Sequence, residues 1–266
     1  MNDLVPDRIE VCPPDLAVRL KSVWYRHYRV YTKHLFSNGL PPFVEPLFFL
    51  LGIGFGLGHY VGLINGLEYI EFLSAGIIVP PAMYTSSFEC TFGTFIRLEF
   101  DKVYDGMLSS SITVENLLLG EILFAGTKSL FFSGAVLVVV SLFGLIKTPL
   151  AIFAPLIGFL TGLMFGSFSL FITSFVKNIN HFNFYFTGLL TPMFFFSGIV
   201  FPLTNLPGFL QKLALVFPLT HPTEITRALC FNKFHSGLIF NMLYILIFII
   251  LFTYLSIWRL KKRIIN

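Results

Sequence analysis

The sequence predicts an all-α membrane protein with six transmembrane helices, an amphipathic helix before them, and a re-entrant helical hairpin between spans five and six. Composition is the first reason, since the chain is 55% hydrophobic and 12% charged, whereas soluble domains carry about 25% charged residues. The second is the recurrence of apolar runs of the length that crosses a bilayer, about 20 residues. The third is a set of prolines that interrupts the fifth run, between residues 189 and 206.

The segment 15–36 precedes the first span and predicts a two-faced helix. One face is apolar and the other basic; the apolar face holds Leu16, Leu20, Val23, Trp24, His27, Tyr31 and Leu35, and the basic face Arg19, Ser22, Arg26, Arg29 and Lys33. Such a helix is typical of the membrane interface, although an ordinary packed cytosolic helix shows the same pattern. We expect residues 1–40 to be cytoplasmic and Pro41 and Pro42 to bend the chain into the first span.

Six apolar runs then form a predicted permease domain over residues 41–258. The expected spans are 42–61, 69–95, 117–145, 150–176, 184–203 and 238–258. The longest of these runs exceed the thickness of a bilayer and are expected to tilt or to extend beyond it.

Basic residues between the runs predict the orientation. Thirteen Lys and Arg residues lie before span one, after spans two and four, and in a basic tail at 259–266, against four in the opposite loops. Both termini are therefore expected in the cytoplasm of a multi-pass protein.

The cytoplasmic loop 96–116 is the largest polar stretch on that side. It predicts a short charged helix containing Arg97, Glu99, Phe100, Asp101, Lys102, Tyr104 and Asp105, and Thr113 is placed to cap the next helix. A projecting helix of mixed charge with aromatic residues suits docking on a cytosolic partner. A solvated loop explains the pattern equally well.

Ionisable residues at membrane depth are Glu45, Glu89, Glu121 and Lys128. Residues of this kind are candidates for function, although Glu45 lies in the first turn of its helix, where the dipole favours an anion. Lys128 pairs with Glu89 or with Glu121 in this interpretation. We favour a structural ion pair over a proton relay, because no series of acids and histidines crosses the membrane.

The segment 189–206 contains Pro192, Pro202 and the pair Ser197–Gly198, and Pro207 follows it directly. Proline removes a backbone donor, and the freed carbonyls of a membrane segment need partners in the protein or in cavity water. The fifth span is therefore expected to break near the outer surface, followed by an extracytoplasmic re-entrant region at 200–237.

No catalytic or metal site is predicted. The sequence lacks H-E-x-x-H, G-x-S-x-G and G-x-x-x-x-G-K-[ST] motifs, which mark zinc proteases, serine hydrolases and phosphate-binding loops. If this protein uses ATP, another chain must bind it.

The order of these elements resembles the membrane permease of the ABC-2 exporter family over nearly the whole chain. The matching residues are Pro192, Ser197, Gly198, Pro202, Pro207, Pro218, Thr220 and Arg227, together with LSSSITVENLLLGEIL at 108–123. The chain departs from the family at Phe217, where Asn is usual, and at Glu121, where a basic residue is frequent.

The resemblance implies a homodimer that assembles with two copies of a separate ABC ATPase, which binds ATP and Mg; no cofactor is expected in this chain and no nucleic acid. The N-terminal helix and the 96–116 loop would contact the ATPase. The substrate path would be lined by Met83, Tyr84, Phe88, Phe194, Phe195 and Ser197, and the outer gate would comprise Pro192, Gly198, Pro202, Pro207, Pro218, His221 and Arg227. The expected location is the bacterial inner membrane.

The segment PLTH at 218–221, with Glu224 and Arg227, is most similar to the branch that exports lipid-linked saccharides, including nodulation lipo-oligosaccharides. The 34 Phe residues do not decide the substrate, because aromatic walls suit acyl chains as well as sugars and a compositional bias also explains them. Export of a drug or another lipid is the alternative within this fold. A membrane-embedded enzyme or an accessory scaffold is the alternative outside it.

Overall fold

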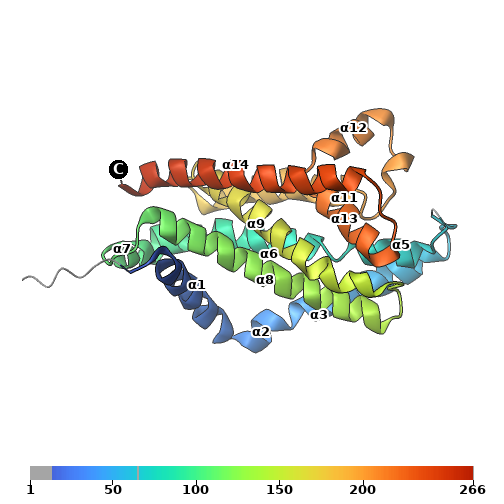
Figure 1. Ribbon diagram of the computed structural model, residues 1–266, viewed down its shortest axis with the longest axis horizontal. Helices are drawn as coiled ribbons and strands as arrows, with labels where there is room; N and C mark the ends of the chain where they lie inside the picture. Colours follow the sequence, from blue (N-terminus) through green and yellow to red (C-terminus); the bar gives the residue numbers. More distant parts are fainter. Residues whose placement is uncertain (1–13, 65, 266) are drawn as a thin grey trace, which may run out of the picture.

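The computed structural model describes residues 14–64 and 66–265 of the chain, so residues 1–13 of the predicted N-terminal segment and residue 266 of the predicted tail lie outside it. Within these ranges the protein is helical, and an isolated bridge between Ile64 and Leu67 is its only β pairing. The long elements run side by side along the long axis of the molecule (Figure 1). In chain order they are α1 (Leu16–Thr32), α2 (Leu35–Gly39), α3 (Pro41–Phe49), η1 (Leu50–Phe55), α4 (Gly56–Gly58), α5 (Tyr69–Gly76), α6 (Pro80–Phe88), η2 (Glu89–Gly93), η3 (Ile96–Phe100), α7 (Val103–Leu108), α8 (Val114–Leu142), η4 (Pro149–Phe153), α9 (Ala154–Thr173), η5 (Ile179–His181), α10 (Phe182–Tyr185), η6 (Phe186–Leu190), α11 (Thr191–Phe196), η7 (Leu203–Asn205), α12 (Gly208–Val216), α13 (Thr220–Phe231) and α14 (Gly237–Ile265).

Within the described parts of the chain, four helices are long and apolar enough to cross a membrane. They are Leu35–Gly58, Val114–Leu142, Pro149–Thr173 and Gly237–Ile264, and they correspond to the predicted spans one, three, four and six. The first begins earlier than predicted, because α1 ends in a turn at residues 33 and 34 and α2 starts at Leu35. The bend expected at Pro41 and Pro42 corresponds to a bend at Leu40 that separates α2 from α3. The last is longer than predicted, because α14 continues through the basic residues 259–263.

The predicted second and fifth spans are built from shorter pieces. Helix α5 ends at Gly76, and α6 begins at Pro80 and continues through η2 and η3 to Phe100. Pro80 and Pro81 carry no backbone N–H, so the carbonyls one turn earlier lose their helical donors and the helix is interrupted. The fifth helical run ends at Phe196 rather than at residue 203, because Gly198 adopts a positive φ of 76°, the conformation that commonly terminates a helix.

Small residues allow the two central helices, α8 and α9, to pack closely. A Cβ added at Gly162 of α9 would lie 2.9 Å from the Cα of Gly126 and still closer to the side chain of Ser129. Such close contact between small residues is the usual way in which membrane helices associate without a hydrophobic driving force. The pair therefore forms a compact centre on which the other helices pack.

Helix α1 crosses α8 at a second close contact. Val23 of α1 is fully buried, and a Cβ added at Gly120 of α8 would lie 2.6 Å from the Cβ of Val23. The indole Nε1 of Trp24 donates a hydrogen bond to Thr127 Oγ1 at 3.1 Å. The amphipathic helix thus rests against the same end of α8 that lies next to the 96–116 loop (Figure 1).

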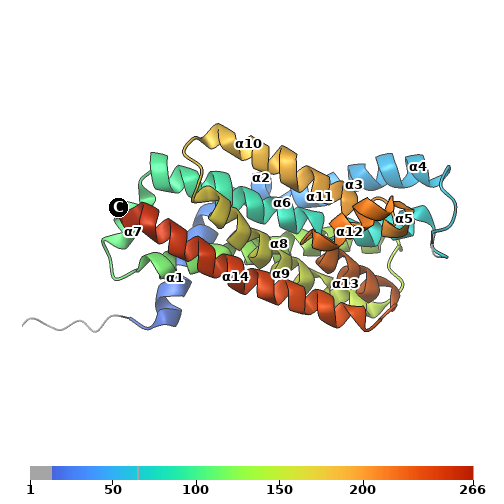
Figure 2. The same cartoon turned by 90° about the horizontal axis from the view of Figure 1, so that it is seen from above.

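The two ends of the molecule carry different elements. Helix α7 and the C-terminal end of α14 lie at one end of the long axis, and α5, α12 and α13 lie towards the other (Figures 1 and 2). Figure 2 also shows α10 and α11 running alongside α6. The segment with the interrupting prolines and the polar 96–116 loop are therefore far apart along the molecule.

Candidate functional site

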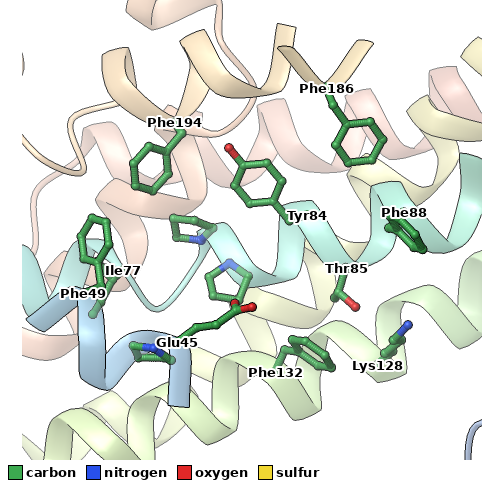
Figure 3. Close-up of a pocket in the computed structure, with 13 residues that line it drawn as sticks. Glu45, Phe49, Ile77, Tyr84, Thr85, Phe88, Lys128, Phe132, Phe186 and Phe194 are labelled. Carbon is green, nitrogen blue, oxygen red and sulfur yellow. The ribbon is translucent and has the colours of Figure 1, made fainter. Parts of the chain in front are cut away.

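An apolar cavity of about 550 Å³ lies among α3, α6, α8 and the η6–α11 run (Figure 3). Its wall consists of seven aromatic or aliphatic side chains, three prolines and three polar or charged residues. The lining residues are Glu45, Pro46, Phe49, Ile77, Pro80, Pro81, Tyr84, Thr85, Phe88, Lys128, Phe132, Phe186 and Phe194. The cavity, called the apolar cavity below, falls within the volume range of ordinary ligand sites, about 300–1,000 Å³.

Three of the six residues predicted to line a path stand in this wall. Tyr84 and Phe88 are four residues apart and therefore share one face of their helix, and Phe194 approaches Tyr84 with ring centroids 6.4 Å apart. Met83 lies in the protein core with no exposed surface, and Ser197 is also buried. Phe195 instead lies at the surface with 46% of its area exposed.

Sequence reasoning did not place Phe49, Phe132 or Phe186 in the wall. A signal was present for two of them, because Phe49 lies four residues after Glu45 and Phe132 four residues after Lys128. Residues at this spacing share a helical face. Glu45 and Lys128 each line the cavity together with the phenylalanine four residues later, Phe49 and Phe132 (Figure 3).

Next to the apolar cavity lies a cluster of buried charges. Lys128 Nζ lies 3.0 Å from Glu89 Oε2, and Arg97 Nη1 lies 2.7 Å from Glu89 Oε1. Arg97 Nε lies 2.9 Å from Glu121 Oε1. Of the two pairings left open for Lys128, the structure contains the one with Glu89, while Glu121 pairs with Arg97.

The four charges cancel, and this balance permits their burial. Glu121 is 1% exposed, and its second oxygen, Oε2, accepts a hydrogen bond from Thr94 Oγ1 at 2.8 Å. Buried ions are tolerated when they are paired and hydrogen-bonded. The cluster joins the η2–η3 end of span two to α8, and η2 is a π-helical turn, an irregularity that is frequent at functional sites.

Helix α1 reaches the cluster through His27. Its Nε2 lies 3.6 Å from Glu121 Oε1, and its ring stacks on Phe124 at 5.3 Å between centroids. Burial lowers the pKa of His27 to about 4, although the carboxylate of Glu121 opposes this shift. His27 is therefore neutral at physiological pH and leaves the balance of the four charges unchanged.

The residues predicted to dock on a partner differ in their exposure to solvent. Phe100, Asp101, Lys102 and Asp105 are exposed, whereas Arg97 and Tyr104 are turned inward, Tyr104 with 1% of its surface exposed. Glu99 lies 2.8 Å from Arg263 Nη2 at the end of α14. The expected single charged helix is wrong, because Lys102 adopts a left-handed φ of 51° that separates η3 from α7.

The expected cap of the following helix is confirmed. Thr113 Oγ1 accepts a hydrogen bond from the backbone N–H of Asn116, three residues later. This hydrogen bond satisfies one of the free donors at the start of α8. The exposed group of Phe100, Asp101, Lys102 and Asp105 thus lies on a short connection between two fixed helices.

At the other end, the residues of the predicted gate surround two short helices, α12 and α13. Pro207 precedes α12, Pro202 precedes η7, and Pro218 lies between α12 and α13. Pro192 is the second residue of α11, which continues directly from η6. Pro202, Pro207 and Pro218 thus precede short helices, where a missing N–H costs little, whereas Pro192 lies inside the fifth helical run.

Arg227 of α13 holds the interruption after span five. Its Nη2 donates a hydrogen bond to the carbonyl of Gly198 at 2.8 Å, and its guanidinium lies 4.0 Å from the ring centroid of Phe72 in α5. Gly76 leaves room for this contact, because a Cβ there would lie 2.9 Å from the carbonyl oxygen of Ile199. Arg227 therefore connects α5, α13 and the segment at Gly198.

His221 connects the same region to the last span. Its Nδ1 lies 2.8 Å from Asn241 Oδ1 of α14, and Asn241 Nδ2 donates to Glu224 Oε2 at 2.7 Å. The ring of His221 stacks on that of Tyr244 with their centroids 3.8 Å apart. Asn241 and Tyr244 were not singled out from the sequence, since a polar residue inside an apolar run gives no indication of its partner.

Comparisons with known proteins agree with this architecture. The profile of the ABC-2 type transporter family matches residues 18–231. Nodulation protein J of Sinorhizobium fredii is 33% identical over 92% of this chain and 94% of its own length. Nodulation protein J of Rhizobium meliloti is 34% identical over 82% of this chain and 84% of its own, and the inner membrane transport permease YadH of Escherichia coli is 23% identical over 92% and 95%.

Proposed function

Because the chain belongs to the ABC-2 type transporter family, and is thus a permease component of an ABC transporter, we propose that it exports a lipid-linked saccharide. Family membership also implies an ABC ATPase as partner.

The assembly we propose is a homodimer of this permease with two ATPase subunits in a bacterial inner membrane. Each permease has six spans, the second and fifth of which are the interrupted runs from Tyr69 to Phe100 and from Ile179 to Phe196. An even number of spans and the thirteen-to-four distribution of basic residues favour cytoplasmic termini. Helix α1 then lies at the cytoplasmic interface, and α12 and α13 form a re-entrant gate on the outer side.

The contact with the ATPase is assigned to the exposed group Phe100, Asp101, Lys102 and Asp105. These side chains are accessible and carry both charge signs around an aromatic ring that is 63% exposed. Aromatic anchors with charged surroundings are typical of protein interfaces. Arg97 and Glu121, just behind this group, would transmit its movement to α6 and α8.

The apolar cavity is the observation that carries the proposal for the cargo. A wall of phenylalanines and prolines between spans one, two, three and five suits an acyl or prenyl chain. The relatives called nodulation protein J support the lipid-linked saccharide branch. The small number of hydrogen-bonding groups in the wall also fits a second candidate, the efflux of a drug or of another lipid.

Mass spectrometry of a deletion strain tests this choice of cargo. Loss of the gene is expected to cause a glycolipid to accumulate in the inner leaflet, and expression of the intact chain is expected to clear it. An unchanged glycolipid profile together with increased drug sensitivity would instead support drug efflux. An unchanged profile with unchanged sensitivity would leave an enzyme or a scaffold as the better assignment.

Charge reversal of Asp101 and Lys102 tests the proposed contact with the ATPase. The double variant Asp101→Lys, Lys102→Asp is expected to lose the ATPase on co-purification, because both side chains are exposed. Lys212→Glu, an exposed reversal on α12, serves as the matched control. If the double variant retains the ATPase as well as the control does, the contact lies elsewhere.

A further inference from the structure

A second, polar cavity of about 370 Å³ lies between α1 and the η2–η3 end of span two. Three cationic side chains, Arg26, Arg97 and Lys128, reach its wall, together with His27 and His34. The acidic residues of the wall are Glu89 and Asp101. This space, called the polar cavity below, is lined in part by members of the charge cluster.

Arg26 distinguishes the polar cavity from a closed ion cluster. Arg97 and Lys128 already pair with Glu89 and Glu121, but no carboxylate lies within ion-pair distance of Arg26 among residues 14–64 and 66–265. Its side chain is half-buried, and burial and the neighbouring Arg97 lower the pKa of Arg26, although the carboxylates of Glu121 and Asp101 oppose this shift. A cation held next to another cation attracts an anion from outside.

The polar and apolar cavities meet at Lys128, which lines both. Its Nζ lies 5.2 Å from the ring centroid of Tyr31, in the polar wall, and 6.0 Å from that of Phe132, in the apolar wall. Figure 3 shows the ammonium group of Lys128 at the edge of the apolar cavity, beyond Phe132. Lys128 is thus the boundary between a cationic compartment and an apolar one.

We propose that the two cavities together bind one anionic amphiphile, with its phosphate or sulfate group beside Arg26 and its alkyl chain among Tyr84, Phe88 and Phe132. Each half of such a molecule finds matching chemistry, because guanidinium groups bind phosphate and sulfate oxygens through paired hydrogen bonds and aromatic walls bury alkyl chains. This inference rests on the proposed function and narrows its cargo to lipids with an anionic group.

A photoreactive alkyl phosphate tests the proposal on the full-length chain in nanodiscs of uncharged lipid. The probe is dodecyl phosphate with a diazirine at the chain end. Labelling is expected to saturate and to map to peptides that contain Tyr84, Phe88 or Phe132. Inorganic phosphate, which has no chain, is expected to compete far more weakly than unlabelled dodecyl phosphate.

Two arginines of α1 provide a matched pair of variants. Arg26→Gln is expected to weaken labelling about tenfold, the usual effect of losing one charge-assisted hydrogen bond, and Arg26→Lys is expected to recover part of it. Arg29→Gln changes an exposed arginine outside the cavity and is expected to leave labelling unchanged. Equal losses in the two Gln variants would overturn the proposal in favour of general attraction to a basic surface.

Thr85→Phe tests the alkyl half separately. Thr85 lines the apolar cavity, so the larger ring is expected to abolish labelling by the long-chain probe while the protein keeps its wild-type melting temperature. Unchanged labelling by a folded Thr85→Phe variant would exclude the apolar cavity as the site. If this variant unfolds, the peptide map of the wild type decides, because labels outside the cavity would contradict the proposal.

The fate of the bound amphiphile identifies its source. In the complex with the ATPase, a transported amphiphile is expected to increase the ATP hydrolysis rate, whereas a resident bilayer lipid is expected to bind without this effect. Both results support the site, because labelling requires no ATPase. Failure of the export function with intact labelling is therefore distinguishable from failure of the site itself.

Discussion

Single residues in this protein act mainly through charges that are removed from water. Glu89 shows this best, because it accepts from both Arg97 and Lys128 while only 14% of its side chain is exposed. Glu121 plays the same part for Arg97 and brings His27 of α1 into the cluster. Removing one member of such a cluster leaves the charge of its partner uncompensated in a buried environment.

Glu89→Gln is expected to lower the free energy of unfolding by about 3–5 kcal/mol, the usual cost of breaking a buried ion pair. The Gln side chain keeps the shape of Glu but leaves Lys128 without a counter-charge and Arg97 with Glu121 alone. Denaturation with SDS in mixed micelles measures the loss. Glu115→Gln is the control, since Glu115 and its partner Lys261 are both more than one-third exposed. Exposed pairs contribute about 0–1 kcal/mol to stability. Equal losses of stability in the two variants would mean that the charge cluster is solvated.

His27 predicts a loss of stability in acid. Its pKa is lowered by burial from 6.5 to about 4 in the folded protein, in an environment that also contains Glu121, Arg97, Glu89 and Arg26. The unfolded chain therefore binds this proton more tightly, so the stabilising contribution is complete above pH 6.5 and is lost as pH falls from 6.5 towards 4. His27→Gln is expected to reduce the pH dependence of the melting temperature between pH 6.5 and pH 4. An unchanged pH dependence in the variant would assign the acid sensitivity to other groups.

Individual elements in this fold are defined by where their hydrogen bonds stop and by how closely they pack. Thr113, the interrupting prolines and Gly198 were recognisable from residue type alone, because capping, missing donors and positive φ are local properties. The faces of α6 were not recognisable. Met83 and Tyr84 are adjacent and both apolar, yet the structure turns Met83 into the core and Tyr84 into the apolar cavity.

The same reasoning explains why the charged residues were only partly predicted. The sequence indicated that Lys128 needs a carboxylate, but Glu89 lies 39 positions earlier in the chain, and no local pattern reveals which of the two carboxylates packs against Lys128. Arg97 was expected on the surface because it lies in the polar loop 96–116. It turns inward because Glu121, 24 positions later in the chain, offers it a buried partner.

Helix packing gives a prediction at this scale. Gly162→Ala is expected to cost about 1–3 kcal/mol, the usual range for overpacking, because its Cβ would meet Gly126 and Ser129 of α8. Gly52→Ala is the matched control, since no heavy atom lies within 4 Å of a Cβ at that position. Unfolding in SDS compares the two, and equal stability would show that α8 and α9 are free to separate.

At the scale of the whole molecule, the proposed ATPase contact and the proposed gate lie at opposite ends of two central helices. The exposed group of Phe100, Asp101, Lys102 and Asp105 lies next to the ion cluster. This cluster connects α1, the η2–η3 segment and α8. The apolar cavity lies between that cluster and the interruption held by Arg227. In the proposed mechanism, movement started by the ATPase reaches the cavity through the cluster and opens the outer hairpin.

ATP-dependent transport in proteoliposomes tests the central claim most directly. The permease is co-reconstituted with its co-purified ATPase, and the outward movement of a radiolabelled acylated oligosaccharide is measured with and without ATP and Mg. We expect movement only with both, and we expect Thr85→Phe, which fills the apolar cavity, to abolish it while the ATPase stays bound. Equal movement with and without ATP, or full transport by the filled variant, would contradict the account.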